Sequence, residues 1–127
     1  MSKVERILAV DWGSQRIGLA IAILEANLVL PLMAISSLKE LKKIASVEQI
    51  DLLIIGNPLS LSGESNNKSE FNNFLNALKE KISLPIKLFD ERLSSKQADV
   101  LLGKIDKSKR DSVAAMVILQ SYLEKNG

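Results

Sequence analysis

Residues 6–35 read RILAVDWGSQRIGLAIAILEANLVLPLMAI and contain three apolar runs that are separated by turn signals. The runs cover residues 6–10, 17–24 and 28–35, and the residues from Asp11 to Ser14 make the first break. Short apolar runs bounded by turn residues are typical of strands. Pro31 lacks the backbone N–H that an interior strand uses, so the third run should be an edge strand or a broken strand. The segment predicts a three-stranded antiparallel meander.

The remaining sequence alternates between helical and strand patterns. Ser37, followed three residues later by Glu40, forms a capping-box pattern that indicates a helix start. Apolar residues between 71 and 82 recur at helical spacing. We expect, in order, a helix from residue 37, a strand at 51–55 that ends at Gly56, a loop at 57–67, a helix over 71–82, a strand at 85–89, a helix from 94 or 95 to 102, a basic loop at 104–110 and a helix over 111–125.

This order of elements predicts an α/β fold. The length of 127 residues fits one domain, which we expect to cover residues 1–127. A meander followed by strand–helix units predicts a mixed five-stranded sheet covered by helices. Because crossover connections are right-handed and join parallel strands, the later strands should run parallel to the first.

The composition excludes several kinds of chemistry. The chain has no Cys and no His, which excludes disulfides, thiolate or imidazole metal sites and imidazole-based triads. Metals that bind oxygen, such as Mg²⁺ or Mn²⁺, remain compatible with the composition. The net charge of +2 predicts no partner by itself. Since no apolar run approaches the ~20 residues that cross a bilayer, and the first residues show no cleavage-site pattern, we expect a cytoplasmic protein without a membrane partner.

Carboxylates stand where parallel strands end and where the last helix begins. Asp11 follows the first strand, Asp90 and Glu91 follow the strand at 85–89, and Asp111 opens the last helix. Ligands of open α/β sheets bind beyond the carboxyl ends of the strands. If the first and last strands lie side by side, these acids meet at one edge of the sheet.

The last helix supports a buried position for its acid. Asp111 shares helical spacing with small and apolar residues, namely Ala114, Ala115, Ile118 and Tyr122. Several carboxylates in one partly buried site repel each other unless a cation neutralises them. One or two Mg²⁺ or Mn²⁺ ions would do so, and paired metals are a known device for phosphodiester cleavage. Taken alone, each acid is also explained as a turn residue or a helix cap.

Possible phosphate-binding groups surround these acids in the sequence. The loop from Gly56 to Gly63, which includes Asn57, follows a strand at the same edge, and its backbone amides could approach a phosphate. Basic residues lie in the first hairpin, after Glu91 and just before the last helix, namely Arg16, Arg92, Lys104, Lys107, Lys109 and Arg110. Positive charge of this kind suits a polyanionic substrate, although a solvated charged loop has the same composition.

Four motifs in order resemble the bacterial pre-16S rRNA nuclease family, also called RuvX or YqgF-type and formerly described as Holliday junction resolvases. Asp11-Trp12-Gly13-Ser14-Gln15-Arg16-Ile17-Gly18-Leu19-Ala20 is similar to the family's opening Asp-x-Gly-x-x-Arg-x-Gly-x-Ala. Gly56-Asn57-Pro58 resembles its Gly-x-Pro loop. Asp90-Glu91-Arg92-Leu93-Ser94-Ser95 resembles its Asp-Glu-Arg-Leu-Thr-Thr, and the segment from Asp111 to Leu123 resembles its closing helix.

The resemblance implies an RNase H-like fold and divalent-metal-dependent hydrolysis of phosphodiester bonds. It implies that Asp11, Glu91 and Asp111 are the catalytic residues and the ligands of one or two Mg²⁺ or Mn²⁺ ions. We favour Glu91 over Asp90 because adjacent strand residues point to opposite faces and Glu has the longer reach. The residues expected to bind substrate are Arg16, Asn57, Arg92, Lys107, Lys109 and Arg110. The implied partners are pre-16S rRNA, cleaved at its 5′ end, and the pre-ribosomal small subunit.

Other functions fit parts of the same sequence. A Holliday junction resolvase would use the same chemistry on branched DNA and would need a dimer. The sequence shows no clear dimer face, so we expect a monomer or a weak homodimer. A non-catalytic RNA-binding or ribosome-assembly module would keep the acids without using them. An actin-like ATPase shares the Asp-x-Gly pattern but needs two lobes, which this length disfavours.

Overall fold

The computed structural model describes residues 4–13, 16–57, 68–90 and 110–126. For residues 57, 68, 90, 110–114, 125 and 126 it describes the backbone. The elements are β1 (Arg6–Trp12), β2 (Ile17–Ile23), β3 (Leu28–Ile35), α1 (Leu38–Val47), β4 (Leu52–Asn57), α3 (Lys68–Lys81), β5 (Ile86–Asp90) and α5 (Arg110–Asn126). No helix among these is long and apolar enough to cross a membrane.

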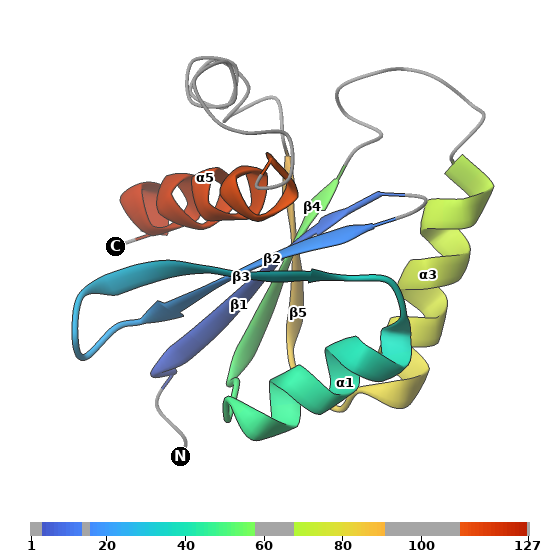
Figure 1. The fold of residues 1–127 in the computed structure, drawn as a ribbon, viewed down its shortest axis with the longest axis horizontal. Coiled ribbons are helices and arrows are strands. Elements are labelled where there is room, and N and C mark those ends of the chain that lie inside the picture. Colours follow the sequence, from blue (N-terminus) through green and yellow to red (C-terminus); the bar gives the residue numbers. More distant parts are fainter. Residues whose placement is uncertain (1–3, 14–15, 58–67, 91–109, 127) are drawn as a thin grey trace.

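The strands form one five-stranded mixed sheet in the order β3-β2-β1-β4-β5 (Figure 1). β1, β2 and β3 make the predicted antiparallel meander, and β4 and β5 run parallel to β1. β3 lies at an edge, as Pro31 predicts, because a residue without an N–H is tolerated there. The predicted fold class is confirmed for the described residues.

The condition that the first and last strands lie side by side is wrong. β4 lies between β1 and β5. Its residues from Leu52 to Gly56 are all buried, which suits a central position, whereas β5 exposes Lys87 and Leu88 and suits an edge. The carboxyl ends of β1, β4 and β5 nevertheless share one edge of the sheet, because all three strands are parallel.

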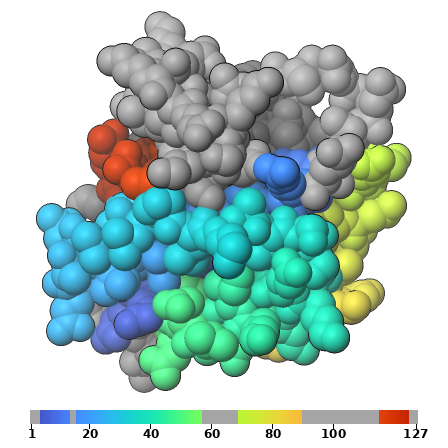
Figure 2. All heavy atoms as spheres, viewed as in Figure 1, coloured from blue at the N-terminus to red at the C-terminus, as the bar shows by residue number. Residues whose placement is uncertain are grey.

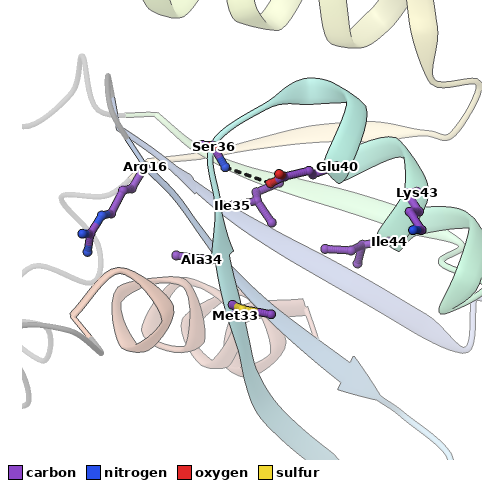
Figure 3. Close-up of a pocket in the computed structure, with 8 residues that line it drawn as sticks. All are labelled: Arg16, Met33, Ala34, Ile35, Ser36, Glu40, Lys43 and Ile44. Carbon is purple, nitrogen blue, oxygen red and sulfur yellow. Dashed lines mark hydrogen bonds between the residues drawn. The ribbon is translucent and has the colours of Figure 1, made fainter.

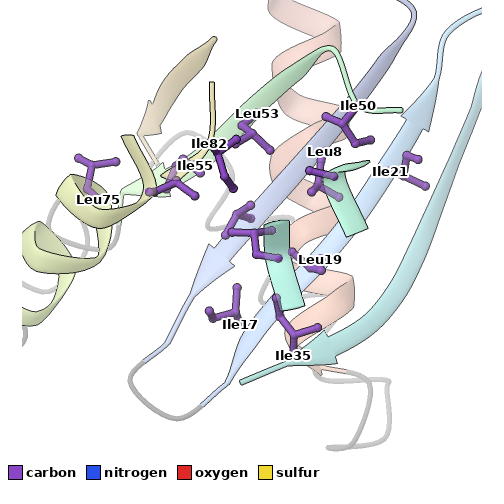
Figure 4. Close-up of a cluster of buried hydrophobic side chains, with 14 of the residues drawn as sticks. Leu8, Ile17, Leu19, Ile21, Ile35, Ile50, Leu53, Ile55, Leu75 and Ile82 are labelled. Atoms are coloured by element: carbon purple, nitrogen blue, oxygen red, sulfur yellow. The ribbon is translucent and has the colours of Figure 1, made fainter. Parts of the chain in front are cut away.

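Helices cover both faces of the sheet (Figure 1). In β1, Leu8 and Val10 face the cluster that includes Leu41 of α1 and Leu78 of α3. Figure 4 shows this cluster between the sheet and the helices. The alternate residues of β1, Ile7 and Ala9, belong to a second cluster with Ala115, Ile118 and Leu119 of α5. Because strand residues alternate between the two faces of the sheet, this pattern shows on which face each later residue of β1 lies.

The predicted cap of α1 is present with a small difference. Ser37 is the N-cap, and its Oγ accepts a hydrogen bond from the backbone N–H of Glu40 at 3.2 Å. The Glu40 carboxylate accepts from the backbone N–H of Ser36 at 3.1 Å, one residue before the N–H that a standard capping box uses. The two bonds fix the path of the chain from β3 into α1.

Helix and strand ends differ from the predictions by one to three residues. β1 continues through Asp11 and Trp12 because they pair with Gly18 and Ile17 of β2. α5 begins at Arg110, which the sequence pattern places in the preceding loop. The helix predicted from 94 or 95 to 102, and the loops at 58–67 and 104–109, lie outside the described residues.

Candidate active site

Asp11 lies at the carboxyl end of the central strand β1, and its partner on each neighbouring strand is a glycine. Its cross-strand partners are Gly18 of β2 and Gly56 of β4. Since glycine has no side chain, no neighbour in this row of the sheet covers the carboxylate from the adjacent strands. Asp11 itself is half-buried. By the alternation of Ile7 and Ala9, it lies on the α5 side of the sheet.

The turn after β1 depends on Gly13. A Cβ atom at this position would lie 2.7 Å from the carbonyl oxygen of Arg16, which is closer than real Cβ contacts allow. The contact is with backbone, so a side chain here requires the turn to move. Gly13 therefore lets the chain return tightly from Asp11 to Arg16, whose side chain is exposed at the same edge.

The ends of β4 and β5 bring the backbone of Asp90 to this edge. Asn57 pairs with Asp90 one row beyond the row of Asp11 and Gly56. In β5, Phe89 packs in the α5 cluster and Lys87 donates a hydrogen bond to the Tyr122 hydroxyl of α5 at 3.3 Å. The odd-numbered residues of β5 that the structure describes thus lie on the α5 side, as Asp11 does.

Helix α5 carries the third acid, Asp111, in its first turn. Ala115 and Ile118, four and seven residues further on, are buried against the sheet, and Tyr122 is half-buried. This is the stripe that the sequence predicts for the buried face. In the projection of Figure 1, α5 begins at the end of the sheet where β4 and β5 finish.

The structure therefore brings part of the predicted site together. Asp11 and Arg16 are described with their side chains at the carboxyl edge, and the backbones of Asn57, Arg110 and Asp111 are described. Glu91, Arg92, Lys107 and Lys109 lie outside the described residues. Within the ranges whose side chains are described, no three acidic groups are close enough to hold a metal ion.

Trp12 is a residue at the site that the sequence pattern does not single out. Its ring lies 5.6 Å from the ring of Phe71 in an edge-to-face arrangement and 6.2 Å from that of Phe74. Both phenylalanines belong to α3, on the sheet face opposite α5. The aromatic contacts hold the end of β1 against α3 and so help to position Asp11. The three-residue spacing of Phe71 and Phe74 indicates that both lie on one face of a helix. It does not indicate that they contact Trp12.

Solved structures identify the fold as RNase H-like. The chain is similar to Thermus thermophilus RuvC, with a TM-score of 0.65 and 8% identity over 95% of this chain and 96% of that one. A complex of a Fowlpox virus resolvase with Holliday junction DNA gives a TM-score of 0.59 and 17% identity over 95% and 98%. At these identities the likeness shows the fold alone, which is one used by nucleases.

The family follows from the sequence comparisons. The model of the family described as "RuvX: Holliday junction resolvase" matches residues 5–125. The "Putative pre-16S rRNA nuclease" of Orientia tsutsugamushi (strain Ikeda) is 35% identical over 95% of this chain and 85% of that protein. The protein of the same name from Chloroflexus aggregans (strain MD-66 / DSM 9485) is 31% identical over 94% of each. This chain belongs to the RuvX family, and it is accordingly a nuclease, a hydrolase of phosphodiester bonds.

Proposed function

We propose that residues 1–127 form a single RNase H-like nuclease domain that acts in the cytoplasm on the 5′ end of pre-16S rRNA, with one or two Mg²⁺ or Mn²⁺ ions. The observation that carries the proposal is the position of Asp11. It lies half-buried at the carboxyl end of the central parallel strand, between two glycines, where sheets of this kind bind ligands. The names of the curated relatives support the choice of RNA substrate.

The proposed metal ligands are Asp11, Glu91 and Asp111. Asp11 and the described odd-numbered residues of β5 lie on the α5 side, and Asp111 begins α5. Continuing the alternation of β5 by two residues from Phe89 favours Glu91 over Asp90 as the acid that joins Asp11. Ala115 and Ile118 favour an inward position for Asp111, because they are buried one and two turns further along.

An all-oxygen ligand set fits a hard divalent cation. The chain offers carboxylates and no His or Cys, which matches Mg²⁺ or Mn²⁺ rather than zinc. A bound ion would supply positive charge and Lewis acidity at the scissile phosphate. The three acids would hold it at the sheet edge, and the absence of side chains at Gly18 and Gly56 leaves room beside Asp11 for the phosphate.

The basic residues would bind and orient the polyanionic chain. Arg16 is exposed at the same edge as Asp11. We assign the same role to Arg92, which follows Glu91, and to Lys107, Lys109 and Arg110, which precede Asp111. We also assign it to the neutral Asn57 at the end of β4. Cationic side chains that contact phosphates set the register of the substrate and contribute salt-dependent affinity.

Branched DNA is the second candidate substrate. The description of the family and the Fowlpox virus resolvase complex both favour it. A resolvase needs two active sites related by a two-fold axis, which implies a stable dimer. We favour RNA, as a monomer or weak homodimer, because the relatives that match almost the whole chain are named for the pre-16S rRNA substrate.

Parallel cleavage assays separate the two substrates. The purified full chain is mixed with an end-labelled pre-16S rRNA 5′ fragment or a four-way DNA junction, in Mn²⁺, in Mg²⁺ and in EDTA. We expect metal-dependent cleavage of the RNA and little cleavage of the junction. Symmetrical cuts in the junction, together with intact RNA, would reject the RNA assignment.

A further inference from the structure

A hollow at the β3 edge of the sheet shares Arg16 with the proposed active site. It encloses about 630 Å³ and lies where β3 passes into α1. Its lining consists of Arg16, Met33, Ala34, Ile35, Ser36, Glu40, Lys43 and Ile44 (Figure 3). In Figure 2, β3 and α1 form much of the described surface on this face of the molecule.

A β-bulge in β3 forms one wall of this hollow. Ile17 pairs with Ile35 and Leu19 pairs with Leu32, so Met33 and Ala34 of β3 together lie opposite the single residue Gly18 of β2. Gly18 is also the partner of Asp11, which places the bulge two strands away in the same row, about 10 Å across the sheet. Bulges re-aim side chains and are frequent beside active sites. Met33 is 84% exposed, the most exposed large apolar side chain among the described residues.

Two cationic side chains lie on either side of Met33, whose side chain forms the apolar wall of the hollow. Figure 3 shows Arg16 at one side of the hollow and Lys43 at the other, with β3 between them. In the part of the chain that the structure describes, neither takes part in an ion pair. The carboxylate of Glu40 also lines the hollow, and it accepts the backbone N–H of Ser36. The three charged side chains leave a net positive charge of one.

We propose that this hollow binds a single-stranded RNA segment that flanks the scissile phosphate. Two cations at opposite ends of the hollow can each contact a phosphate of the same RNA strand. The exposed thioether of Met33 offers an adaptable apolar surface for a base. Asp11 lies on the α5 side of the sheet, whereas Lys43 belongs to α1, which covers the other side. An RNA strand that passes from Asp11 to Arg16, over Met33 and on to Lys43 therefore crosses the edge of the sheet at β3. The inference rests on the proposed nuclease function and adds to it a contact surface outside the acidic site.

Paired substitutions on α1 test the proposal. Lys43 and Lys42 are adjacent and both exposed, but Lys42 lines a different hollow, next to Lys81 of α3. The affinity of the full chain for a labelled single-stranded pre-16S rRNA fragment is measured in EDTA at several salt concentrations. We expect Lys43→Ala to weaken binding several-fold and to reduce the slope of log K against log salt by ~0.7, the value for one lost single-strand phosphate contact. Lys42→Ala should leave the slope unchanged.

A second pair tests the apolar wall. Met33→Ala should weaken binding of the same RNA several-fold without changing the salt slope, because it removes no charge. Leu30→Ala on the same strand serves as its control, since Leu30 is also exposed but does not line the hollow. Equal effects of Lys43→Ala and Lys42→Ala, or no effect of either, would overturn the proposal. So would a change in oligomeric state by Met33→Ala without loss of RNA binding, which would identify the hollow as an interface between copies.

Cleavage assays on the same variants keep this inference separate from the nuclease proposal. If cleavage in Mn²⁺ persists while Lys43 and Lys42 behave alike, the subsite is wrong and the nuclease proposal stands. The opposite outcome is that neither the wild type nor any variant cleaves RNA, while Lys43→Ala still weakens RNA binding more than Lys42→Ala does. In that case the hollow binds RNA and the nuclease proposal fails.

Discussion

At the scale of single residues, the site depends on whether Asp90, the last residue of β5, or Glu91, the next residue, joins Asp11. The alternation of Lys87 and Phe89 on the α5 side favours Glu91. Glu91→Gln and Asp90→Asn each remove one negative charge, and they do so at adjacent residues. We expect these two residues to lie on opposite faces of the sheet. We expect Glu91→Gln to lower cleavage by more than about 100-fold, beyond the loss typical of residues that only support a metal ligand. Asp90→Asn should retain most of the activity in the same cleavage assay. The reverse order of effects would contradict the assignment.

Gly13 is the second residue whose role follows from a measured contact. Gly13→Ala places a Cβ atom 2.7 Å from the Arg16 carbonyl oxygen, so the turn between β1 and β2 must shift. We expect a loss of about 1–3 kcal/mol in the free energy of unfolding, as for other overpacked sites, and reduced cleavage. Urea denaturation followed by the fluorescence of Trp12, the sole tryptophan, measures the first effect. Unchanged stability and activity would show that the turn adjusts without cost.

At the scale of elements, the parallel pairing of β1 and β4 is fixed at its start by Asp51. The Asp51 Oδ2 atom accepts hydrogen bonds from the backbone N–H groups of Glu5 and Arg6, at 2.9 and 3.0 Å. This carboxylate anchors the start of the β1–β4 pair, and Asp11 lies opposite Gly56 at the other end of the strands.

Removal of this carboxylate should destabilise the fold. We expect Asp51→Ala to lower the free energy of unfolding by about 1.5–3 kcal/mol, the range for hydrogen bonds to a charged group. Glu25→Ala, an exposed acid in the turn between β2 and β3, removes the same charge and should change stability by less than about 0.5 kcal/mol. Thermal or urea unfolding of the two variants decides between them, and equal effects would show that charge rather than the β1–β4 link is responsible.

At the scale of the whole molecule, the sequence predicts the elements better than their arrangement. The meander, the edge position of β3 and the parallel direction of the later strands follow from apolar runs, Pro31 and the handedness of crossovers. The position of β4 between β1 and β5 does not, because an apolar run shows that a strand is buried but not which strands are its neighbours. The contact of Trp12 with Phe71 and Phe74 likewise joins residues about sixty positions apart, beyond any local pattern.

The candidate site is predictable to the extent that it lies in local motifs. Residues 6–14 alone place Asp11 at a strand end, and the structure shows that this strand is central. The bulge at Met33 and the hollow between Arg16 and Lys43 were not predicted, since they depend on the register between β2 and β3. Local sequence indicates where chemistry can occur, whereas the surface that receives the substrate is set by pairing across the sheet.

The most direct test of the central claim is cleavage of the pre-16S rRNA 5′ fragment by the wild type, Asp11→Asn and Asp51→Asn, each in Mn²⁺ and shown to be folded by Trp12 fluorescence. Asp11 and Asp51 lie at opposite ends of the paired strands β1 and β4, so the two variants make the same chemical change at the proposed site and away from it. We predict that Asp11→Asn loses more than about 100-fold of the cleavage rate while Asp51→Asn stays close to wild type. Cleavage by a folded Asp11→Asn protein at the wild-type rate would contradict the account.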